Sequence, residues 1–235
     1  MFSILIPTFN NLECLKLCIY SLKKNSKFTN QIICHVNVGN DGTLKYLEKN
    51  NIEFTHTTYN SGICEGINKA AKFAKFDYFL YGHDDFYFSP DWDQILLDEV
   101  KTIGHNNFYL SGTMMNKGKI SFDCGQTPSE FDEKKFLNEY KKYNFYDFQG
   151  STWAPTLIHK NVWNTVGGFS EEFFPGSGSD PDFNMKLWSR GIRIFKGVNK
   201  CKVYHFGSIV LRNKINNLHK ANKFGSKGGK IFLLK

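Results

Sequence analysis

The sequence predicts a single α/β domain in which a mostly parallel central sheet is flanked by helices. The 235 residues suffice for one good hydrophobic core, and a hydrophobic content of 41% is typical of a folded globular protein. Short apolar runs alternate with amphipathic segments along the first half of the chain. Such alternation favours parallel strands connected by helices on both faces of one sheet.

The first half supplies the regular part of this pattern. Residues 3–6 are continuously apolar, as in a strand buried on both faces, and Pro7 is expected to end that strand. Leu12, Leu15 and Ile19 recur at helical spacing, with Asn10 or Asn11 as the expected helix cap. The later expected elements are strands at 32–38, 53–57 and after Asp77, and helices at 44–48, 63–74 and from Pro90.

The second half is less regular, and its elements carry weaker signals. The expected strands are 108–114, 120–122, 150–159, 192–195 and 202–205, and the expected helices are 130–143, 161–166 and one that begins near Asp180. Neither an internal repeat nor a linker precedes the basic C-terminal residues. One domain is therefore expected rather than two.

The net charge of +8 is unevenly distributed. Residues 183–235 contain 13 Lys/Arg and no Asp/Glu, whereas the rest of the chain has 17 basic and 22 acidic residues. Such a cationic segment is suited to binding a nucleotide diphosphate, an anionic membrane surface or nucleic acid. For the C-terminal end of the segment, a solvated basic tail is an equal alternative. Because no recognition motif supports nucleic acid, none is expected as a partner.

Cysteine usage and hydropathy indicate the compartment. The six cysteines form no C-x-x-C pair, which favours small buried thiols in a reducing environment. The N-terminus lacks the basic leader of a secretory signal, and no run has the roughly 18 apolar residues of a membrane span. We expect a soluble cytoplasmic protein, at most peripheral on an anionic membrane through its basic tail.

Two adjacent carboxylates follow the strand expected after Asp77. Asp84 and Asp85 come directly after an apolar run, and ligands bind at the carboxyl ends of strands in open α/β sheets. Neighbouring carboxylates in a half-buried place need a compensating cation or donor network, and a hard divalent ion shared with a phosphate is the usual solution. A solvated Asp-Asp turn before the next helix is the structural alternative.

The motifs, taken together, resemble family-2 glycosyltransferases of the GT-A fold, a Rossmann-like α/β architecture. The resemblance covers roughly residues 1 to 206, and the motifs occur in the family's order and spacing. They are residues 4–10, Asn40-Asp41-Gly42, Asn60-Ser61-Gly62 with Asn68, Asp84-Asp85, Gly167-Gly168-Phe169 with Glu172, and Ser179-Asp180-Pro181-Asp182 with Arg190 and Gly191. This resemblance implies a GT-A domain at 1–211, with a nucleotide-binding half (1–114) and an acceptor-binding half (115–211), and a basic tail at 212–235.

The resemblance also implies a nucleotide-sugar site at the edge of the sheet. The implied nucleotide-binding residues are Pro7, Thr8, Asn10, Asp41, Gly62, Asn68 and Asp84. In the family, the aspartate matching Asp41 meets the base, and Asp84 is placed for the ribose. An Asx-turn that holds a tight loop is the alternative reading of Asp41.

The metal site implied by the resemblance departs from the family pattern at one position. The D-x-D motif of the family appears here as His83-Asp84-Asp85, so a histidine occupies the first acidic position. Asp85 would bind Mn²⁺ or Mg²⁺ bridging the diphosphate. His205 lies where related enzymes often place a histidine, and metal ligation and a structural role are equal alternatives for it. His83 is expected to lie behind the ligands, in contact with them rather than with the ion.

The resemblance further implies transfer with inversion, which needs a base for the acceptor hydroxyl. Asp180 matches that base, with Asp182 as the alternative, and a helix cap is the structural reading of Asp180. The usual Glu-Asp pair of the family is Ser179-Asp180 here. Trp153 is expected to form part of the acceptor wall or else to lie in the core. Lys202, Arg212 or Lys214 could add positive charge at the departing diphosphate.

The predicted function is therefore a metal-dependent inverting glycosyltransferase. Its donor is expected to be a nucleoside diphosphate sugar, most simply a UDP-sugar, and its acceptor a hydroxyl of a glycan or lipid-linked molecule. One alternative is a catalytically degenerate module that only binds a nucleotide or glycan. The other is a sugar nucleotidyltransferase, although such enzymes carry a glycine-rich basic loop where this chain has Pro7-Thr8-Phe9-Asn10.

Overall fold

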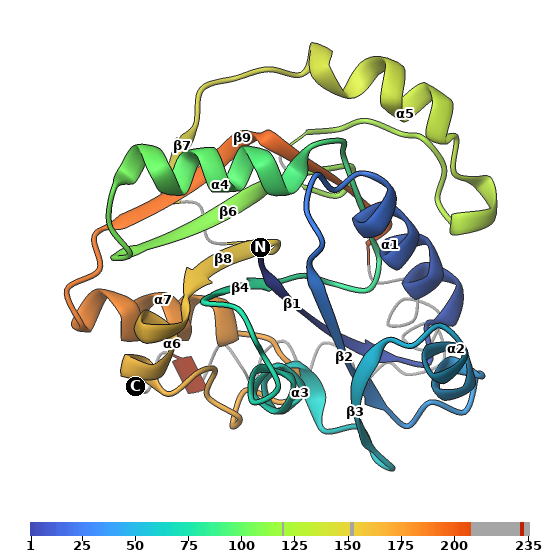
Figure 1. The fold of residues 1–235 in the computed structure, drawn as a ribbon, viewed down its shortest axis with the longest axis horizontal. Helices are drawn as coiled ribbons and strands as arrows, with labels where there is room; N and C mark the ends of the chain where they lie inside the picture. The colour runs from blue at the N-terminus through green and yellow to red at the C-terminus, as the bar shows by residue number, and fades with distance from the viewer. Residues whose placement is uncertain (119, 151–152, 208–230, 233–235) are drawn as a thin grey trace.

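The computed structural model describes residues 1–118, 120–150, 153–207 and 231–232, and its strands form one sheet (Figure 1). The strands are β1 (Ser3–Phe9), β2 (Gln31–Asn37), β3 (Glu53–Thr57), β4 (Tyr78–Tyr81), β5 (Phe86–Phe88), β6 (Phe108–Met115), β7 (Phe148–Gln149), β8 (Thr156–His159) and β9 (Ile194–His205). The α-helices are α1 (Leu12–Lys24), α2 (Thr43–Lys49), α3 (Gly62–Ala71), α4 (Trp92–Ile103), α5 (Glu133–Glu139), α6 (Lys160–Val166) and α7 (Ser179–Ser189).

The sheet is mixed rather than mostly parallel. Its strand order is β3-β2-β1-β4-β8-β6-β9-β5, and β7 pairs with β9. The β1–β2, β2–β3, β1–β4 and β6–β9 pairs are parallel, whereas β8 runs antiparallel to both β4 and β6, and β5 and β7 run antiparallel to β9. The α/β class is thus confirmed, and the parallel arrangement holds for the first half of the chain. Strands from both halves interleave in one sheet, because β8 lies between β4 and β6.

Strand β1 continues past Pro7, so the expected end of this strand was wrong. The carbonyl oxygen of Leu5 accepts a hydrogen bond from the Gly82 nitrogen (3.1 Å), on the β4 side of the strand. Pro7 turns its backbone polar groups to the same side, where β4 has already ended at Tyr81. The missing N–H of the proline therefore removes no hydrogen bond from the β1–β4 pairing, and β1 pairs with β2 as far as Phe9.

The second half differs more from expectation. The strands expected at 192–195 and 202–205 are one strand, β9, whose pairing with β6 shifts register between Ser111 and Thr113. The strand expected at 120–122 is a single bridge between Met115 and Ile120. The helix expected at 130–143 divides into a 3-10 turn (Pro128–Glu130), α5 and a second 3-10 turn (Tyr140–Lys142). Strand β5 was not expected at all, because three aromatic residues carry no periodic signal.

Helices cover both faces of the sheet. His35 of β2 faces α3, where a Cβ on Gly66 would lie 2.7 Å from its ring. The neighbouring residue Cys34 points to the opposite face and lies near Cys18 of α1. On that second face, Nε1 of Trp92 in α4 donates to the carbonyl oxygen of Leu22 in α1 (3.4 Å). Strands β1 and β2 are accordingly buried along almost their whole length, as the apolar runs predicted.

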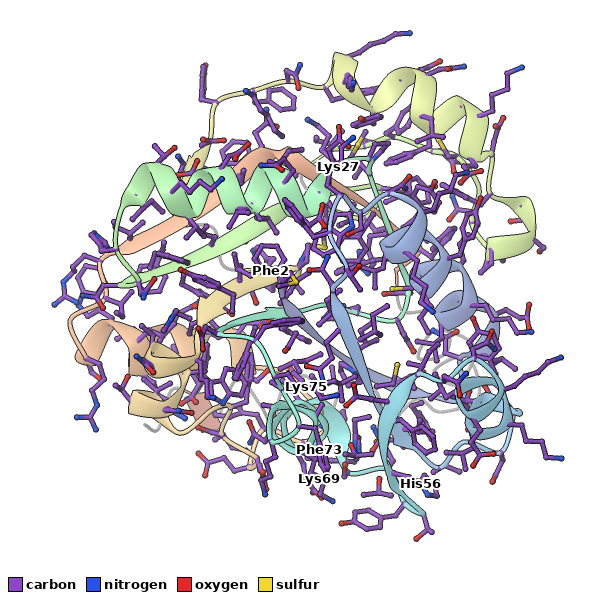
Figure 2. All side chains as sticks on the ribbon, viewed as in Figure 1. Phe2, Lys27, His56, Lys69, Phe73 and Lys75 are labelled. Atoms are coloured by element: carbon purple, nitrogen blue, oxygen red, sulfur yellow. The ribbon has the colours of Figure 1, made fainter. Side chains whose placement is uncertain are left out.

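Two hydrophobic clusters hold the molecule together. The main core contains Phe2, which lies fully buried in the interior (Figure 2), together with residues of β1, β2, β4, β5, β6, β8 and β9, and partly buried Phe54 of β3 packs against it. A smaller cluster packs the segment after β6 and the helix α5 onto the aromatic residues Tyr87 and Tyr204. The segment between β6 and β8 is thereby attached to the sheet through β5 and β9.

Most of the basic tail predicted at 212–235, including Arg212 and Lys214, lies outside the described residues. Of its members, Ile231 and Phe232 are described, and both are partly buried against the main core. In the described part of the chain, no helix has the length and apolar character that crossing a membrane requires.

Candidate metal and nucleotide site

Three loops meet at the carboxyl edge of the sheet. The Thr8 hydroxyl at the end of β1 donates to Oδ2 of Asp84 after β4 (2.6 Å). Asn10 has a positive φ of 45°, and its Oδ1 accepts from the backbone nitrogen of Asn40 in the loop after β2 (3.0 Å). Pro7 is buried in β1, two residues before the loop. The predicted nucleotide-binding residues of β1 and β4 are therefore neighbours in space.

The carboxylate of Asp41 accepts hydrogen bonds within its own loop. Its Oδ1 accepts hydrogen bonds from the nitrogen and the hydroxyl of Thr43 (3.2 and 2.6 Å), which is the Asx-turn arrangement. Its Oδ2 accepts from the backbone nitrogen of Leu12 (2.8 Å) and so caps α1, whose expected cap residue Asn11 makes no capping bond through its side chain. The side chain is nevertheless exposed, and a contact of Asp41 with a base stays a prediction.

Asp84 and Asp85 differ in how far they are buried. Asp85 is 3% exposed, and Asp84 is half-buried. Burial and the neighbouring Asp85 charge raise the pKa of Asp84 to about 7, although the bond from Thr8 opposes this shift. Two carboxylates placed in this way favour the binding of a cation, which would lower the pKa of Asp84 again.

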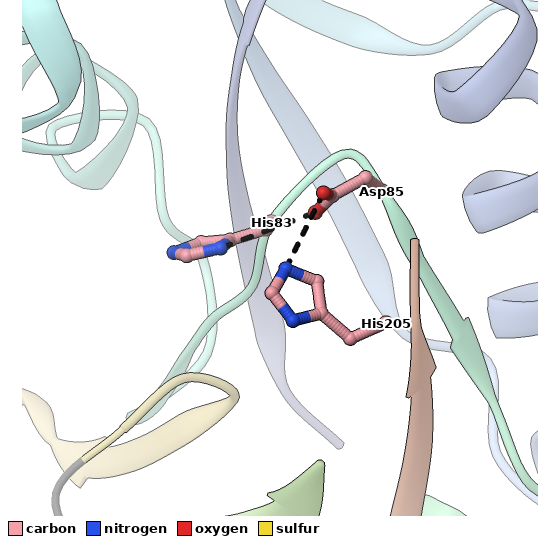
Figure 3. A group of neighbouring side chains, drawn as sticks. All are labelled: His83, Asp85 and His205. Carbon is pink, nitrogen blue, oxygen red and sulfur yellow. Dashed lines mark ion pairs between the residues drawn. The ribbon is translucent and has the colours of Figure 1, made fainter. Parts of the chain in front are cut away.

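Asp85 is the centre of a cluster with two histidines. Its Oδ2 lies 3.4 Å from Nε2 of His205, and its Oδ1 lies 4.0 Å from Nδ1 of His83. Figure 3 shows the two imidazole rings approaching the Asp85 carboxylate from different elements. One potential ligand atom from each residue lies within 4.8 Å of the others. Ligand atoms around one ion with bonds of about 2.1 Å lie roughly 3 to 4 Å apart, so the distances of 3.4 and 4.0 Å from Asp85 suit a divalent metal, and any spacing near the 4.8 Å limit would shorten on binding.

The antiparallel pairing of β5 with β9 assembles this cluster. Phe86 of β5 pairs with His205 of β9, and the backbone nitrogen of Phe206 donates to the carbonyl oxygen of Asp85 (3.1 Å). Residues more than 100 positions apart therefore face each other at one point. The family resemblance named His205 as a candidate ligand, and the unexpected strand β5 is what brings its ring to Asp85.

The donor set fits a metal ion. His205 is 12% exposed in its side chain, and neither of its ring nitrogens has a hydrogen-bond partner among the described residues. A buried imidazole with no partner is costly unless a ligand satisfies it. A divalent ion bound by His205, Asp85 and His83 would supply that partner.

His83 is closer to the centre of the site than the sequence indicated. Its Nε2 lies 2.7 Å from the Tyr81 hydroxyl, and its ring stacks on Phe86 with centroids 4.9 Å apart. These contacts leave Nδ1 directed at Asp85. Burial lowers the pKa of His83 to about 4, with Asp85 opposing the shift, so the imidazole is neutral at neutral pH and able to ligate. The expectation that His83 lies behind the ligands is not supported by this geometry.

Asp180 and Asp182 differ in whether their carboxylates already accept a hydrogen bond. Asp182 is 5% exposed and accepts a hydrogen bond from the Ser170 hydroxyl (2.6 Å). Asp180 lies in the first turn of α7, and no hydrogen bond to its carboxylate is found within the described part of the chain. Burial raises the pKa of Asp180 to about 6. Burial and, after it, the charge of Asp180 raise the pKa of Tyr81, whose hydroxyl lies beside His83. Among the described residues the carboxylate of Asp180 is unpaired, and it is therefore the more available of the two candidate bases.

Gly62 and Asn68 link α3 to the loops of the second half. Gly62 has φ of +82°, and a side chain there would contact Phe174 and the Pro175 backbone. The Asn68 amide nitrogen donates to the carbonyl oxygen of Phe169 and to Glu171, and its oxygen accepts from the Phe169 nitrogen (2.9 Å). Both ends of the Asn68 amide thus anchor the 168–171 loop, and binding of a nucleotide by Gly62 and Asn68 stays a prediction.

Trp153 is 60% exposed, so the core alternative for this residue was wrong. An exposed indole is available to a ligand, and its acceptor role stays a prediction.

Lys202, in contrast, is 1% exposed, and its Nζ donates to Asn144 and to the carbonyl oxygen of Asn199. It is therefore not placed to neutralise a diphosphate. Ser179 stands where the family has an acidic residue. Its hydroxyl donates a hydrogen bond to the carbonyl oxygen of Gly176 and so stabilises the start of α7.

A buried polar network that the sequence did not indicate lies beneath the Asn60-Ser61-Gly62 loop. His35 is fully buried, with Nδ1 2.7 Å from the Thr55 hydroxyl and Nε2 3.2 Å from the Ser61 hydroxyl. Asn37 in turn accepts from both the nitrogen and the hydroxyl of Ser61 (2.7 and 2.9 Å). The network holds the turn that precedes α3 and leads into Gly62, a predicted nucleotide-binding residue.

The titration of His35 gives a testable pH dependence of stability. Burial lowers its pKa from 6.5 to about 4, so the unfolded chain binds a proton more readily than the folded one between these values. Stability should rise with pH across this window and be lost as pH falls. Between pH 7.5 and 4.5, the free energy of unfolding in urea should fall by about 2 to 3 kcal/mol more for the wild type than for His35→Gln. Parallel curves for the two proteins would contradict this account.

The structure is an α/β protein with a group of side chains that could hold a metal ion, His83, Asp85 and His205, at the carboxyl edge of its sheet. Residues 3–160 match the family model described as Glycosyl transferase family 2, and this match covers more than half of the chain. The chain therefore belongs to glycosyl transferase family 2. A comparison with curated protein sequences found no match.

Solved structures with the same architecture include S. aureus TarS. Its likeness has a TM-score of 0.65 at 19% sequence identity, over 88% of this chain and 37% of that chain. TarS 1–349 in complex with UDP gives a TM-score of 0.65 at 16% identity, over 86% of this chain and 59% of that one. TarS 1–349 alone gives 0.62 at 18% identity, over 87% and 60%. The chain thus spans well under two thirds of these proteins, and the likeness shows the fold alone.

Proposed function

We propose that this protein is a metal-dependent inverting glycosyltransferase that takes a sugar from a nucleoside diphosphate donor, with a UDP-sugar favoured. The observation that carries the proposal is the cluster of His83, Asp85 and His205 directly beside the Thr8–Asp84 pair. Membership of the family supports glycosyl transfer. The complex of TarS 1–349 with UDP supports UDP as the nucleotide to test first.

The residues divide into donor and transfer roles in this proposal. Asp84, which accepts a hydrogen bond from Thr8, is proposed to bind the ribose, and Asp41 in the loop after β2 is proposed to bind the base. Asp85 and His205, with His83, hold Mn²⁺ or Mg²⁺. When bound, the ion supplies positive charge that stabilises the departing diphosphate.

Asp180 is the proposed base for the acceptor hydroxyl. A pKa of about 6 leaves the carboxylate ionised at neutral pH yet basic enough to accept a proton. The lack of a hydrogen-bond donor among the described residues keeps its oxygens available, whereas Ser170 occupies Asp182. The proposed acceptor is a hydroxyl of a glycan or a lipid-linked molecule, and the exposure of Trp153 supports the proposal that its indole contacts this acceptor.

Thermal unfolding with nucleotides tests the donor site. A ligand that binds only the folded protein raises Tm in proportion to ln(1 + [L]/Kd), about 2.7 kcal/mol of stability at 100 times Kd. UDP, GDP, CDP and dTDP should each be measured with and without Mn²⁺, and UDP with Mn²⁺ is expected to give the largest shift. A shift with a different base would reassign the donor.

Hydrolysis of the donor then separates an enzyme from a binding module. Slow release of the sugar from the nucleotide in the absence of acceptor is expected of a transferase with an ionised Asp180. Binding of the nucleotide without any hydrolysis or transfer would favour the degenerate module instead.

A further inference from the structure

The Asn68 amide makes three hydrogen bonds to one loop. Its Nδ2 donates to the carbonyl oxygen of Phe169 (2.8 Å) and to Oε1 of Glu171 (3.0 Å), and its Oδ1 accepts from the Phe169 nitrogen (2.9 Å). Because an amide nitrogen carries two hydrogens, both of them are used by this loop. Asn68 lies in the second turn of α3, about 9 Å along the helix axis from Gly62, where the nucleotide is expected. These contacts indicate that Asn68 serves the loop before α7 rather than a nucleotide.

The close approach of this loop to α3 requires a glycine at position 168. Gly168 has a positive φ of 73°, and a Cβ at this position would clash with Oδ1 of Asn68 and lie 2.9 Å from the Trp163 ring. A side chain there would therefore push the loop away from the helix. Figure 1 shows α3 beside the segment that joins α6 to α7.

The first turn of α3 holds the other end of the same loop. The backbone nitrogen of Ile63 donates to the carbonyl oxygen of Pro175 (2.9 Å), and a Cβ on Gly176 would lie 2.8 Å from Cδ1 of Ile63. The carbonyl oxygen of Gly176 in turn accepts from the hydroxyl of Ser179 in α7 (2.6 Å). Helix α3 therefore contacts the loop at both of its ends.

The loop is also attached to the helix that carries Asp180. The ring of Phe169 stacks on that of Phe183, with centroids 4.4 Å apart and an interplanar angle of 14°. Phe183 follows Asp180 by three residues in α7, so the two are neighbours on the helix surface. The Ser170 hydroxyl donates to Asp182 in the same turn (2.6 Å). A shift of the loop relative to α3 would therefore move the first turns of α7 and the carboxylate of Asp180.

We propose that Asn68 is a positioning residue for Asp180, which holds the 168–176 loop on α3 so that α7 keeps this carboxylate in place for transfer, and that Asn68 is not a ligand of the nucleotide. This inference rests on the proposed function for the role of Asp180 as the base. The contacts that carry it involve no nucleotide, metal ion or acceptor, so they can be tested without them.

Steady-state kinetics and nucleotide binding test the role of Asn68. Asn68→Ala should lower kcat by about 10- to 100-fold, because a displacement of about 1 Å of a catalytic group can cost 10²-fold. The Kd of the nucleotide with Mn²⁺, measured by isothermal titration, should stay unchanged. Asn68→Asp keeps the shape of the side chain but replaces the donating nitrogen with an oxygen, so it should lower kcat at least as much. A normal kcat in either variant, or a raised Kd of the nucleotide, would overturn the proposal.

A double-mutant cycle separates positioning of Asp180 from a general structural effect. If Asn68 acts through Asp180, Asn68→Ala should lower the residual rate of Asp180→Asn by no more than about 2-fold. Losses that multiply in the double variant would show a different route and overturn the proposal. Asn164→Ala on the exposed surface of α6 makes the same exchange and is the matched control, which should leave kcat and Kd unchanged.

Hydrogen exchange measures the same link without any transfer. In Asn68→Ala, amides of residues 168–180 should exchange about 10-fold faster, beginning with the Phe169 amide that donates to Asn68, while those of β1 and β2 keep their rates. Unchanged exchange in the loop would overturn the proposal. Faster exchange in the variant, with no transfer by the wild type, would count against the proposed function alone. Transfer by the wild type, with unchanged exchange and kcat in the variant, would count against the positioning role alone.

Discussion

Asp85→Asn is expected to lower metal-dependent sugar transfer by about 10³-fold or more. Asp85 is the sole carboxylate of the His83–Asp85–His205 cluster, and asparagine retains its shape while removing the charge that holds the ion. Loss of the charge stabilisation that a metal gives to a leaving group costs several kcal/mol, and about 4 kcal/mol corresponds to roughly 10³ in rate. Initial rates at saturating Mn²⁺ would measure this loss.

The stability of the same variant separates a metal defect from a folding defect. Asp85 contributes to the raised pKa of Asp84, so removal of its charge relieves repulsion in the metal-free protein. The metal-free variant should melt at the same temperature as the wild type or higher, and its Mn²⁺-dependent shift should vanish. Asp98→Asn on the exposed side of α4 is the matched control and should keep full activity. Full transfer by Asp85→Asn would refute the metal assignment.

Asp180→Asn is expected to lower kcat by about 10² to 10⁴-fold while leaving the affinity for the nucleotide unchanged. The side chain lies in the first turn of α7, whereas Thr8 and Asp84 pair with each other after β1 and β4, and the proposed task of Asp180 begins only when an acceptor is bound. Isothermal titration with the nucleotide and Mn²⁺ checks binding, and single-turnover transfer checks chemistry.

The pH profile gives this prediction a second readout. A base must be ionised, and burial raises the pKa of Asp180 to about 6. Transfer by the wild type should therefore rise with pH up to about 6 and level off above it, and Asp180→Asn should lose this dependence. Asp182→Asn is the informative comparison, because Ser170 already occupies that carboxylate. A normal rate in Asp180→Asn with a large loss in Asp182→Asn would assign the base to Asp182.

The first half of the fold was predictable because its signals are local. Short apolar runs, 4–6 in β1 and 32–34 in β2, are typical of strands that are covered by helices on both faces, and the spacing of Leu15 and Ile19 marks the face of α1 that packs on the sheet. The direction of β8 and the continuity of β9 across its irregular pairing have no such signal. Both depend on which strands lie beside them in the completed sheet.

The order of motifs along the chain was enough to indicate the family, the carboxylate pair Asp84-Asp85 and the candidate base Asp180, because each motif lies at the end of a strand or the start of a helix. The sequence alone left His205 undecided and ranked His83 behind the ligands. Only the tertiary structure brought the two imidazoles to Asp85, since that contact requires the antiparallel pairing of β5 with β9 and the hydroxyl of Tyr81 behind His83. Contacts between residues far apart in sequence depend on the packing of the whole sheet, which no short stretch of residues encodes.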